Sequence, residues 1–363
     1  MGKIKAGIVG CGGIATQKHF PALSLLKDEV EIVHFCDIIE ERAVKAAKAH
    51  GISGAKVSID YNDLVKDKSI DVVYVLTPNV NHCPITCAAL EAGKHVLCEK
   101  PMAISSAEGR KMVETAKKTG KKLTIGYQNR FRRDSRELFS RTRNNELGEV
   151  YFAKAHAIRR RGVPTWGVFP DKSKQGGGPL IDIGTHALDL TLWFMNNYQP
   201  ESVLGQTFQK LKDYPDGNMF GPWDPGKFET EDSAFGLVKM KNGATIYLEA
   251  SWALNMLNAK EAQVTLCGTK AGAEIFGEPW KNEAYVVINK VEQGVLVETG
   301  PSADRGTYGF VGPQTPGDLE ARQWIDAIKN NTEPLVRPEE ALVVTQILEA
   351  IYESAQTGKA VSF

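Results

Sequence analysis

The chain has 363 residues, of which 42% are hydrophobic and 24% are charged. This composition excludes a disordered or fibrous protein, and the length favours two domains. The 44 lysines and arginines balance the 44 aspartates and glutamates, so the formal net charge is zero and gives no general attraction to phosphate. No apolar run approaches the length of a membrane span, about 20 residues. We therefore expect neither a nucleic-acid partner nor a membrane partner. The first ten residues are interrupted by glycines and lack the apolar core of a signal peptide, and the six cysteines are scattered along the sequence. These features predict a cytoplasmic protein with reduced thiols.

Strands and helices alternate in the first third of the chain. The pattern predicts strands over residues 3–9, 30–36, 70–76, 95–98 and 122–125, and helices over 40–50, 81–92 and 105–120. Pro21 is expected to divide the helix after the first strand into two short pieces. Alternation with short links predicts an α/β domain, residues 1–126, with a doubly wound parallel sheet.

The regular alternation of strands and helices ends after Gly126. The pattern there predicts strands over 149–158, 233–240, 244–252, 263–267 and 284–288, and helices over 186–195, 319–330 and 339–357. Asn242 and Gly243 predict a tight hairpin between two of these strands, and residues 213–227 are expected to form a loop. Strands grouped apart from helices predict an α+β domain, residues 127–363, with a mostly antiparallel sheet.

A glycine loop directly after the first strand predicts a cofactor site. Residues 10–15 match G-x-G-x-x-A, whose first glycine permits a tight turn and whose second lets a pyrophosphate approach the backbone. Asp37 follows the second strand, where a carboxylate accepts hydrogen bonds from the adenosine ribose. No cation follows Asp37 to hold a 2′-phosphate, so NAD is favoured over NADP. The alternative is a glycine turn that only joins strand to helix, with Asp37 as a solvated charge.

Two tripeptides follow neighbouring strands of the predicted sheet. Thr77-Pro78-Asn79 comes after the strand at 70–76, and Glu99-Lys100-Pro101 comes after the strand at 95–98. Because open parallel sheets bind ligands at the carboxyl ends of their strands, both tripeptides should face the cofactor. Lys100 is then a candidate catalytic cation, and the alternative is an ordinary surface charge.

The segment 176–186 holds a second group of candidate residues. Its three glycines indicate close approach of the backbone to a ligand or to another chain segment. Asp182 and His186 are four residues apart, so a helix would place them on one face, where the carboxylate can orient the imidazole as a general base. A surface ion pair and a satisfied core histidine are the alternatives. His82 and His156 could add metal ligands but lack diagnostic spacing, so no metal site is predicted.

Together these motifs resemble the Gfo/Idh/MocA family of oxidoreductases. The resemblance rests on the glycine loop, T-P-N, E-K-P and D-x-G-x-H, and it covers nearly the whole chain. It implies a Rossmann domain followed by an α/β domain whose open sheet face forms homodimers or homotetramers. It also implies NAD-dependent hydride transfer to or from a secondary hydroxyl or carbonyl of a sugar or cyclitol. Enzymes that cleave glycosides through a transient ketone, and non-catalytic sugar sensors, are alternatives within the family.

Motif and position together give the expected roles of individual residues. The resemblance implies a catalytic trio of Lys100, Asp182 and His186, and leaves open whether Lys100 or His186 is the base. The expected cofactor contacts are Gly10, Gly12, Gly13, Ile14, Asp37, Thr77, Pro78, Asn79, His82, Glu99, Lys100 and Asn129. The expected substrate contacts are Tyr127, Asn129, Arg160, Trp166 and the trio. The arginines at 159–161 indicate either an anionic substrate or a solvated run of charge.

Overall fold

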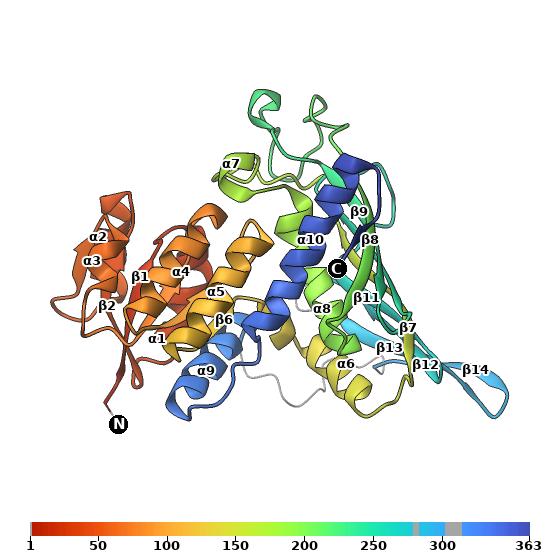
Figure 1. The fold of residues 1–363 in the computed structure, drawn as a ribbon, viewed down its shortest axis with the longest axis horizontal. Coiled ribbons are helices and arrows are strands. Elements are labelled where there is room, and N and C mark those ends of the chain that lie inside the picture. The colour runs from red at the N-terminus through yellow and green to blue at the C-terminus, as the bar shows by residue number, and fades with distance from the viewer. Residues whose placement is uncertain (1, 279–282, 302–313) are drawn as a thin grey trace. The chain divides into compact units, whose positions relative to one another are not determined.

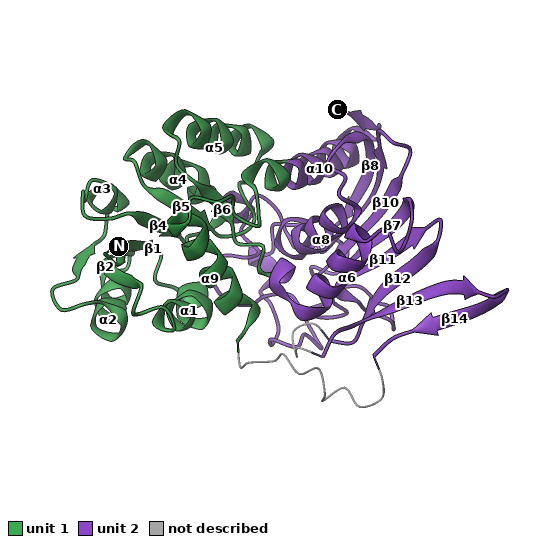
Figure 2. Ribbon diagram, turned by 90° about the horizontal axis from the view of Figure 1, so that it is seen from below, with its two compact units in different colours: residues 1–128, 313–342 green, residues 129–312, 343–363 purple. Residues whose placement is uncertain are grey.

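The computed structural model describes residues 2–278, 283–301 and 314–363. The chain forms two compact units, which Figure 2 colours separately: Met1–Gln128 with Pro313–Leu342, and Asn129–Gly312 with Val343–Phe363. All six cysteines are free thiols, and five of them are buried. Within the described ranges, no helix combines the length and the apolar character needed to cross a membrane.

The first unit contains a six-stranded sheet in which each strand pairs in parallel with its neighbours (Figure 1). Its strands are β1 (Ile4–Val9), β2 (Val30–Cys36), β3 (Lys56–Ser58), β4 (Val72–Val75), β5 (His95–Cys98) and β6 (Leu123–Ile125). The order β3-β2-β1-β4-β5-β6 changes direction between β1 and β4, and such a switch point is where open parallel sheets bind ligands. The predicted doubly wound sheet is confirmed. The sequence did not predict β3, because three mostly exposed residues carry no periodic signal.

The helices of the first unit begin and end largely where their capping residues predict. They are α1 (Phe20–Ser24), α2 (Glu40–His50), α3 (Tyr61–Val65), α4 (His82–Glu91), α5 (Ser106–Thr119) and α9 (Pro316–Lys329). The Ser105 hydroxyl accepts a hydrogen bond from the Glu108 amide at 3.3 Å, and Gly120 ends α5 with φ +66°. A π-helical turn, Ala15–His19, precedes α1, whose first turn contains Pro21, so the two expected short pieces are present.

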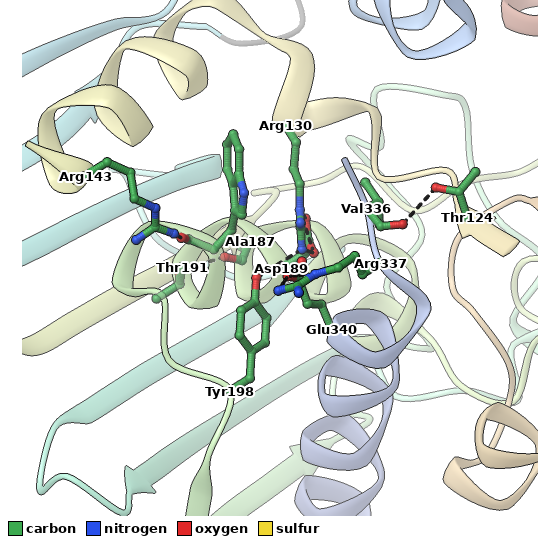
Figure 3. Close-up of polar contacts among 11 residues, drawn as sticks. Thr124, Arg130, Arg143, Ala187, Asp189, Thr191, Tyr198, Val336, Arg337 and Glu340 are labelled. Atoms are coloured by element: carbon green, nitrogen blue, oxygen red, sulfur yellow. Dashed lines mark hydrogen bonds and ion pairs between the residues drawn. The ribbon is translucent and has the colours of Figure 1, made fainter. Parts of the chain in front are cut away.

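Helix α9 completes the core of the first unit, although it follows the strands of the second unit in the sequence. Its Trp324 and Ile325 are buried in the same apolar cluster as Phe20. The Thr124 hydroxyl also donates to the Val336 carbonyl at 2.9 Å (Figure 3). The division made from the sequence at residue 126 left α9 out of the first domain, because a helical pattern does not indicate which core the helix joins.

The second unit is built on a nine-stranded sheet with the order β14-β13-β12-β11-β7-β10-β9-β8-β15. Its strands are β7 (Val150–Ile158), β8 (Pro200–Phe208), β9 (Ser233–Met240), β10 (Thr245–Ser251), β11 (Glu261–Gly268), β12 (Ala271–Phe276), β13 (Tyr285–Glu292), β14 (Val295–Thr299) and β15 (Val361–Ser362). Among these described strands, β7 and β10 form the one parallel pair, which confirms the mostly antiparallel sheet. Asn242 and Gly243, with φ +88° at the glycine, form the predicted turn from β9 to β10.

The second unit also contains helices, some of which pack against the sheet. They are α6 (Arg133–Arg143), α7 (Lys172–Gln175), α8 (Thr185–Met195) and the part of α10 (Pro338–Thr357) that belongs to the unit. Helix α8 packs on β7 and β11 and is buried nearly all round, as a central core helix is. The sequence predicted α8 and α10 within two residues at each end, but it missed α6, whose charged surface hides its one buried stripe.

Candidate active site

The glycine loop between β1 and the π-helical turn leaves space for a ligand. Gly10 has φ +96°, and a Cβ there would lie 2.5 Å from the carbonyl oxygen of Leu76. By contrast, a Cβ at Gly12 would meet nothing within 4 Å, and one at Gly13 would have a single contact at 4.0 Å. The loop itself therefore requires Gly10, whereas Gly12 and Gly13 keep the outer side of the loop clear, which fits the pyrophosphate of a dinucleotide.

Asp37 ties this loop to the end of β2. Its carboxylate is buried, and Oδ2 accepts a hydrogen bond from the Cys11 amide at 2.8 Å while Oδ1 accepts one from the Ile39 amide at 2.9 Å. Each carboxylate oxygen retains a further lone pair for a ribose hydroxyl. Ile38 is exposed and apolar, so the residue that follows Asp37 offers no charge to a 2′-phosphate. These features fit NAD.

His82 joins the two strand-end motifs of the first unit. Its Nδ1 lies 2.7 Å from the carbonyl oxygen of Pro101, and its Nε2 lies 2.9 Å from the carbonyl oxygen of Thr77. Burial lowers the pKa of His82, and the hydrogen bonds to the Pro101 and Thr77 carbonyls act in the opposite direction. The Lys100–Pro101 peptide bond is cis. His82 thus holds the T-P-N and E-K-P turns together, and its direct contact with the cofactor stays a prediction.

Glu99 lies in a buried network of charged side chains. Its Oε1 is 2.7 Å from Lys18 Nζ and 2.8 Å from His19 Nε2, and its Oε2 accepts a hydrogen bond from the Lys100 amide at 3.1 Å. Lys18 Nζ is also 2.7 Å from Oε2 of Glu320, which belongs to α9. The network therefore fixes the Glu99 carboxylate beside the backbone of the candidate catalytic lysine. The predicted contact of Glu99 with the cofactor stays a prediction.

Burial and the two carboxylates set the charges of this network. Burial would raise the pKa of Glu99, but Lys18 and His19 hold that pKa well below its usual value. Burial raises the pKa of Glu320 to about 7, and the neighbouring Glu99 adds to this, against the attraction of Lys18. Burial lowers the pKa of His19, so the neutral ring carries on Nε2 the proton that it donates to Glu99. At neutral pH, Lys18 and Glu99 form the ionised pair, and Glu320 titrates.

In the second unit, the three-glycine segment packs against the chain itself. A Cβ on Gly177 would lie 2.1 Å from the Tyr352 hydroxyl, and one on Gly178 would lie 2.5 Å from the carbonyl oxygen of Glu231. The Glu231 carboxylate accepts hydrogen bonds from the Gly178 amide at 2.9 Å and from the Tyr352 hydroxyl at 2.7 Å. Of the two expectations for these glycines, the structure supports close approach to another segment. Glu231 anchors the start of the helical segment that follows.

Asp182 and His186 lie in that single helical segment. Asp182 is in a π-helical turn, Leu180–Gly184, which continues directly into α8, and such turns are frequent at functional sites. Its Oδ2 accepts a hydrogen bond from the indole N–H of Trp252 at 3.0 Å. Both side chains are half-buried, which keeps them accessible to a substrate. A carboxylate held by a dedicated donor, four residues before an imidazole, is suited to general acid–base chemistry.

The arginine run at 159–161 is divided among different partners. Arg159 makes a two-point ion pair with Glu261 at 2.6 and 2.8 Å, and Arg161 donates to the Asn255 side chain at 3.0 Å. Arg160 is exposed. Because Arg159 is already neutralised, this arrangement does not favour a joint site of three arginines for an anionic substrate.

Three further residues follow β6, where substrate contacts were expected. Tyr127 is fully buried and Asn129 is half-buried, and their contacts with ligands stay predictions. The next residue, Arg130, is fully buried in the second unit, where it bonds both carboxylate oxygens of Asp189 at 2.6–3.2 Å and the Tyr198 hydroxyl at 3.3 Å (Figure 3). Arg130 therefore holds α8 in place, because Asp189 lies in that helix.

Sequence reasoning missed four residues of these sites: Lys18, Glu231, Trp252 and Glu320. Lys18 lies in the π-helical turn that follows the glycine loop, but its partner Glu99 comes 81 residues later in the sequence. The other three act across sequence separations that no local pattern records.

Two family models match this chain. The model described as "Oxidoreductase family, NAD-binding Rossmann fold" matches residues 4–127, and that described as "Oxidoreductase family, C-terminal alpha/beta domain" matches residues 141–363. The chain belongs to the Gfo/Idh/MocA oxidoreductase family. The resemblance seen in the motifs is thereby confirmed, and so is NAD as the cofactor of the first unit, because the first model describes an NAD-binding fold.

Individual members of the Gfo/Idh/MocA family give the range of similarity. D-glucoside 3-dehydrogenase of Escherichia coli (strain K12) is 34% identical over 355 residues, which are 98% of this chain and 96% of that protein. Inositol 2-dehydrogenase of Salmonella paratyphi B is 32% identical over 194 residues, 53% of this chain and 55% of that protein. A solved structure of levoglucosan dehydrogenase in complex with NADH and levoglucosan has a TM-score of 0.83 at 19% identity over 99% of both chains, which is a likeness of fold. The predicted enzyme class, an NAD-dependent dehydrogenase of the sugar and inositol type, is confirmed.

Proposed function

We propose that this enzyme transfers a hydride between NAD and a secondary ring hydroxyl of a glucoside-like sugar, with Lys100, Asp182 and His186 as its acid–base groups. The hydrogen bond from Trp252 to Asp182 carries the proposal, because it holds a carboxylate in place four residues before an imidazole in the same helical segment. The substrate class is supported by the relative named D-glucoside 3-dehydrogenase, which matches 98% of the chain. A cyclitol is the second candidate, since the relative named inositol 2-dehydrogenase matches half of the chain.

The chain's own residues divide the work of oxidation. The dinucleotide, when bound over Gly12 and Gly13, supplies a hydride acceptor. The substrate must lose its hydroxyl proton as the hydride leaves, and we assign removal of that proton to His186. Asp182 orients the imidazole and stabilises the imidazolium that forms. Lys100 binds the substrate oxygen and stabilises the negative charge that develops on it.

Substitution of the proposed base tests this function. With NAD and methyl glucoside, His186→Ala should lower kcat by about 10²–10⁴-fold, the usual contribution of a general base, and added imidazole should restore part of the rate. His156→Ala is the matched control, because His156 pairs with Glu249 at 2.6 Å within the nine-stranded sheet. A normal kcat for His186→Ala would remove its role. Lys100→Met with a larger loss and no imidazole effect in His186→Ala would make Lys100 the base.

We also propose that the enzyme self-associates through the open face of the nine-stranded sheet. Leu204, Leu237, Tyr247 and Lys154 lie in one register row across four strands, while Ala153 beside this row is buried. Leu204 and Leu237 are half exposed, an apolar surface suited to a second copy of the chain. Light scattering should give the mass of a dimer or tetramer, and Leu237→Glu should reduce it to that of a monomer.

The six free thiols further support a cytoplasmic location.

A further inference from the structure

A chain of aromatic rings extends from the candidate catalytic carboxylate to the surface of the second unit. It begins at Trp252, whose indole N–H donates to Asp182 and whose side chain is 0% exposed. Phe169 meets Trp252 edge-on with ring centroids 6.4 Å apart, and Trp166 meets Phe169 edge-on at 5.9 Å. Trp166 also stands perpendicular to Phe220 at 4.8 Å. This aromatic chain thus connects the buried Trp252, which contacts Asp182, with the indole of Trp166, which is 52% exposed.

Two long loops carry the outer rings, and polar bonds fasten these loops to each other. Trp166 lies in residues 159–171, and Phe220 lies in residues 209–232. Asn218 joins the loops twice, by accepting from the Val163 amide at 2.9 Å and donating to the Val163 carbonyl at 3.0 Å. The Thr165 hydroxyl donates to the Phe220 carbonyl at 2.7 Å. The exposed indole is therefore held in place before any ligand arrives, so little side-chain entropy would be lost on binding.

A fixed, half-exposed indole is suited to stack on the C–H face of a sugar ring or on an aromatic ring. A single ring engaged by Asp182 would occupy only the buried end of the aromatic chain. The exposed end suits a second ring attached to the first. Recognition of a charged group through Arg159 is not favoured, because Glu261 already neutralises this arginine.

We propose that Trp166 and Phe220 form a subsite for the aglycone of a neutral glycoside, next to the position where the oxidised sugar ring contacts Asp182. This inference rests on the proposed function and narrows its substrate class. The enzyme would act on glycosides that carry a hydrophobic or pyranose aglycone in preference to the free sugar. Phe169 packs against Trp166, and Trp252 packs against Phe169. The hydrogen bond from Trp252 links the position of the subsite to that of Asp182.

A series of substrates that differ only in the aglycone tests the subsite. We would measure kcat/KM with NAD for glucose, methyl β-glucoside, phenyl β-glucoside and glucose 6-phosphate. The wild-type enzyme should prefer the phenyl glucoside, and Trp166→Ala should lower the ratio of phenyl to methyl glucoside kcat/KM by about tenfold. Trp166→Phe should retain most of that ratio. Tyr214→Ala is the matched control, because Tyr214 is an exposed aromatic residue of the 209–232 loop outside the aromatic chain and should leave the ratio unchanged.

Binding is measured in parallel by calorimetry of phenyl glucoside in the presence of NADH. An unchanged ratio in Trp166→Ala, an equal loss on every sugar, or a wild-type preference for glucose 6-phosphate would overturn the subsite. Binding of phenyl glucoside that depends on Trp166 without any turnover would uphold the subsite and count against the proposed function instead. Thermal unfolding of each variant, together with the milder Trp166→Phe, separates a lost subsite from a misfolded loop.

Discussion

Replacement of Trp252 by phenylalanine isolates one hydrogen bond of the candidate active site. The indole donates to Asp182 Oδ2 at 3.0 Å, and its ring makes edge contacts with Phe169 and Phe228, each at 6.4 Å between centroids. Phenylalanine keeps an aromatic ring at this position but has no N–H group. Trp252→Phe therefore removes the donor to the carboxylate while much of the aromatic packing remains.

The expected loss follows from the environment of Asp182. A hydrogen bond to a charged group contributes about 1.5–3 kcal/mol. Because Asp182 is half-buried, water can replace part of the lost bond, so the lower figure of about 1.5 kcal/mol applies. If the carboxylate must be held while His186 takes the proton, kcat falls about tenfold. The KM for NAD should not change, since the glycine loop and Asp37 belong to the first unit.

Trp223→Phe is the matched control for this prediction. The Trp223 indole is also buried, donates to the Lys212 carbonyl at 2.7 Å, and lies 5.8 Å from Phe228 in the same aromatic cluster. Both variants lose one N–H···O bond and a similar volume, so both should lose a similar amount of stability, about 1–3 kcal/mol by urea unfolding. Initial rates at saturating sugar and NAD then compare kcat. A kcat for Trp252→Phe within twofold of the wild type, or an equal loss in Trp223→Phe, would refute the role of Trp252.

Three further predictions concern the buried network, Asp37 and the glycines. The pKa of Glu320 is raised from 4.5 to about 7 on folding, so the unfolded chain releases this proton first as the pH rises, and the free energy of unfolding should fall across that interval. Glu320→Gln should remove this fall. Measured by urea titration, the free energy of unfolding of the variant should therefore rise by roughly 1–3 kcal/mol relative to that of the wild type between about pH 5 and about pH 8. Asp37→Ser should weaken NAD binding by at least about tenfold and improve the NADP/NAD ratio of kcat/KM, because it removes a charge that repels a 2′-phosphate; an unchanged ratio would contradict this role. Gly12→Ala should raise the KM for NAD with little change in stability, whereas Gly177→Ala should lower the melting temperature by displacing the Tyr352 hydroxyl, and the reverse pattern would contradict both assignments.

Much of the first unit could be predicted from the sequence because its signals are local. The run at 30–36 and the helix at 40–50 match β2 and α2 residue for residue, since a continuous apolar strand and a glycine-terminated helix each carry their own boundaries. The candidate motifs T-P-N and E-K-P could be assigned to one edge of the sheet because the ends of parallel strands meet there. The same logic found Asp37 at the end of β2.

The supporting residues could not be predicted, because their partners are distant in the sequence. Trp252 follows β10 and resembles an ordinary core residue of a strand, yet its indole reaches Asp182, 70 residues earlier. Glu320 belongs to a helix that sequence patterns assigned to the second domain, but it pairs with Lys18 of the first unit. Each buried polar group requires a partner, but only the fold determines which one it finds.

The two glycine runs show why a motif needs its surroundings before it indicates a ligand. Both lead directly into a helical segment that carries candidate site residues, and both were consistent with close approach to a ligand. At Gly12 the space that a Cβ would fill is open, so glycine there leaves room for another molecule. At Gly177 and Gly178 the same space is filled by Tyr352 and Glu231, so glycine there lets the protein pack against itself and lets Glu231 bond the exposed amide. The first run thus leaves room for a ligand, as a cofactor site requires, whereas the second fixes the segment on which Asp182 and His186 lie.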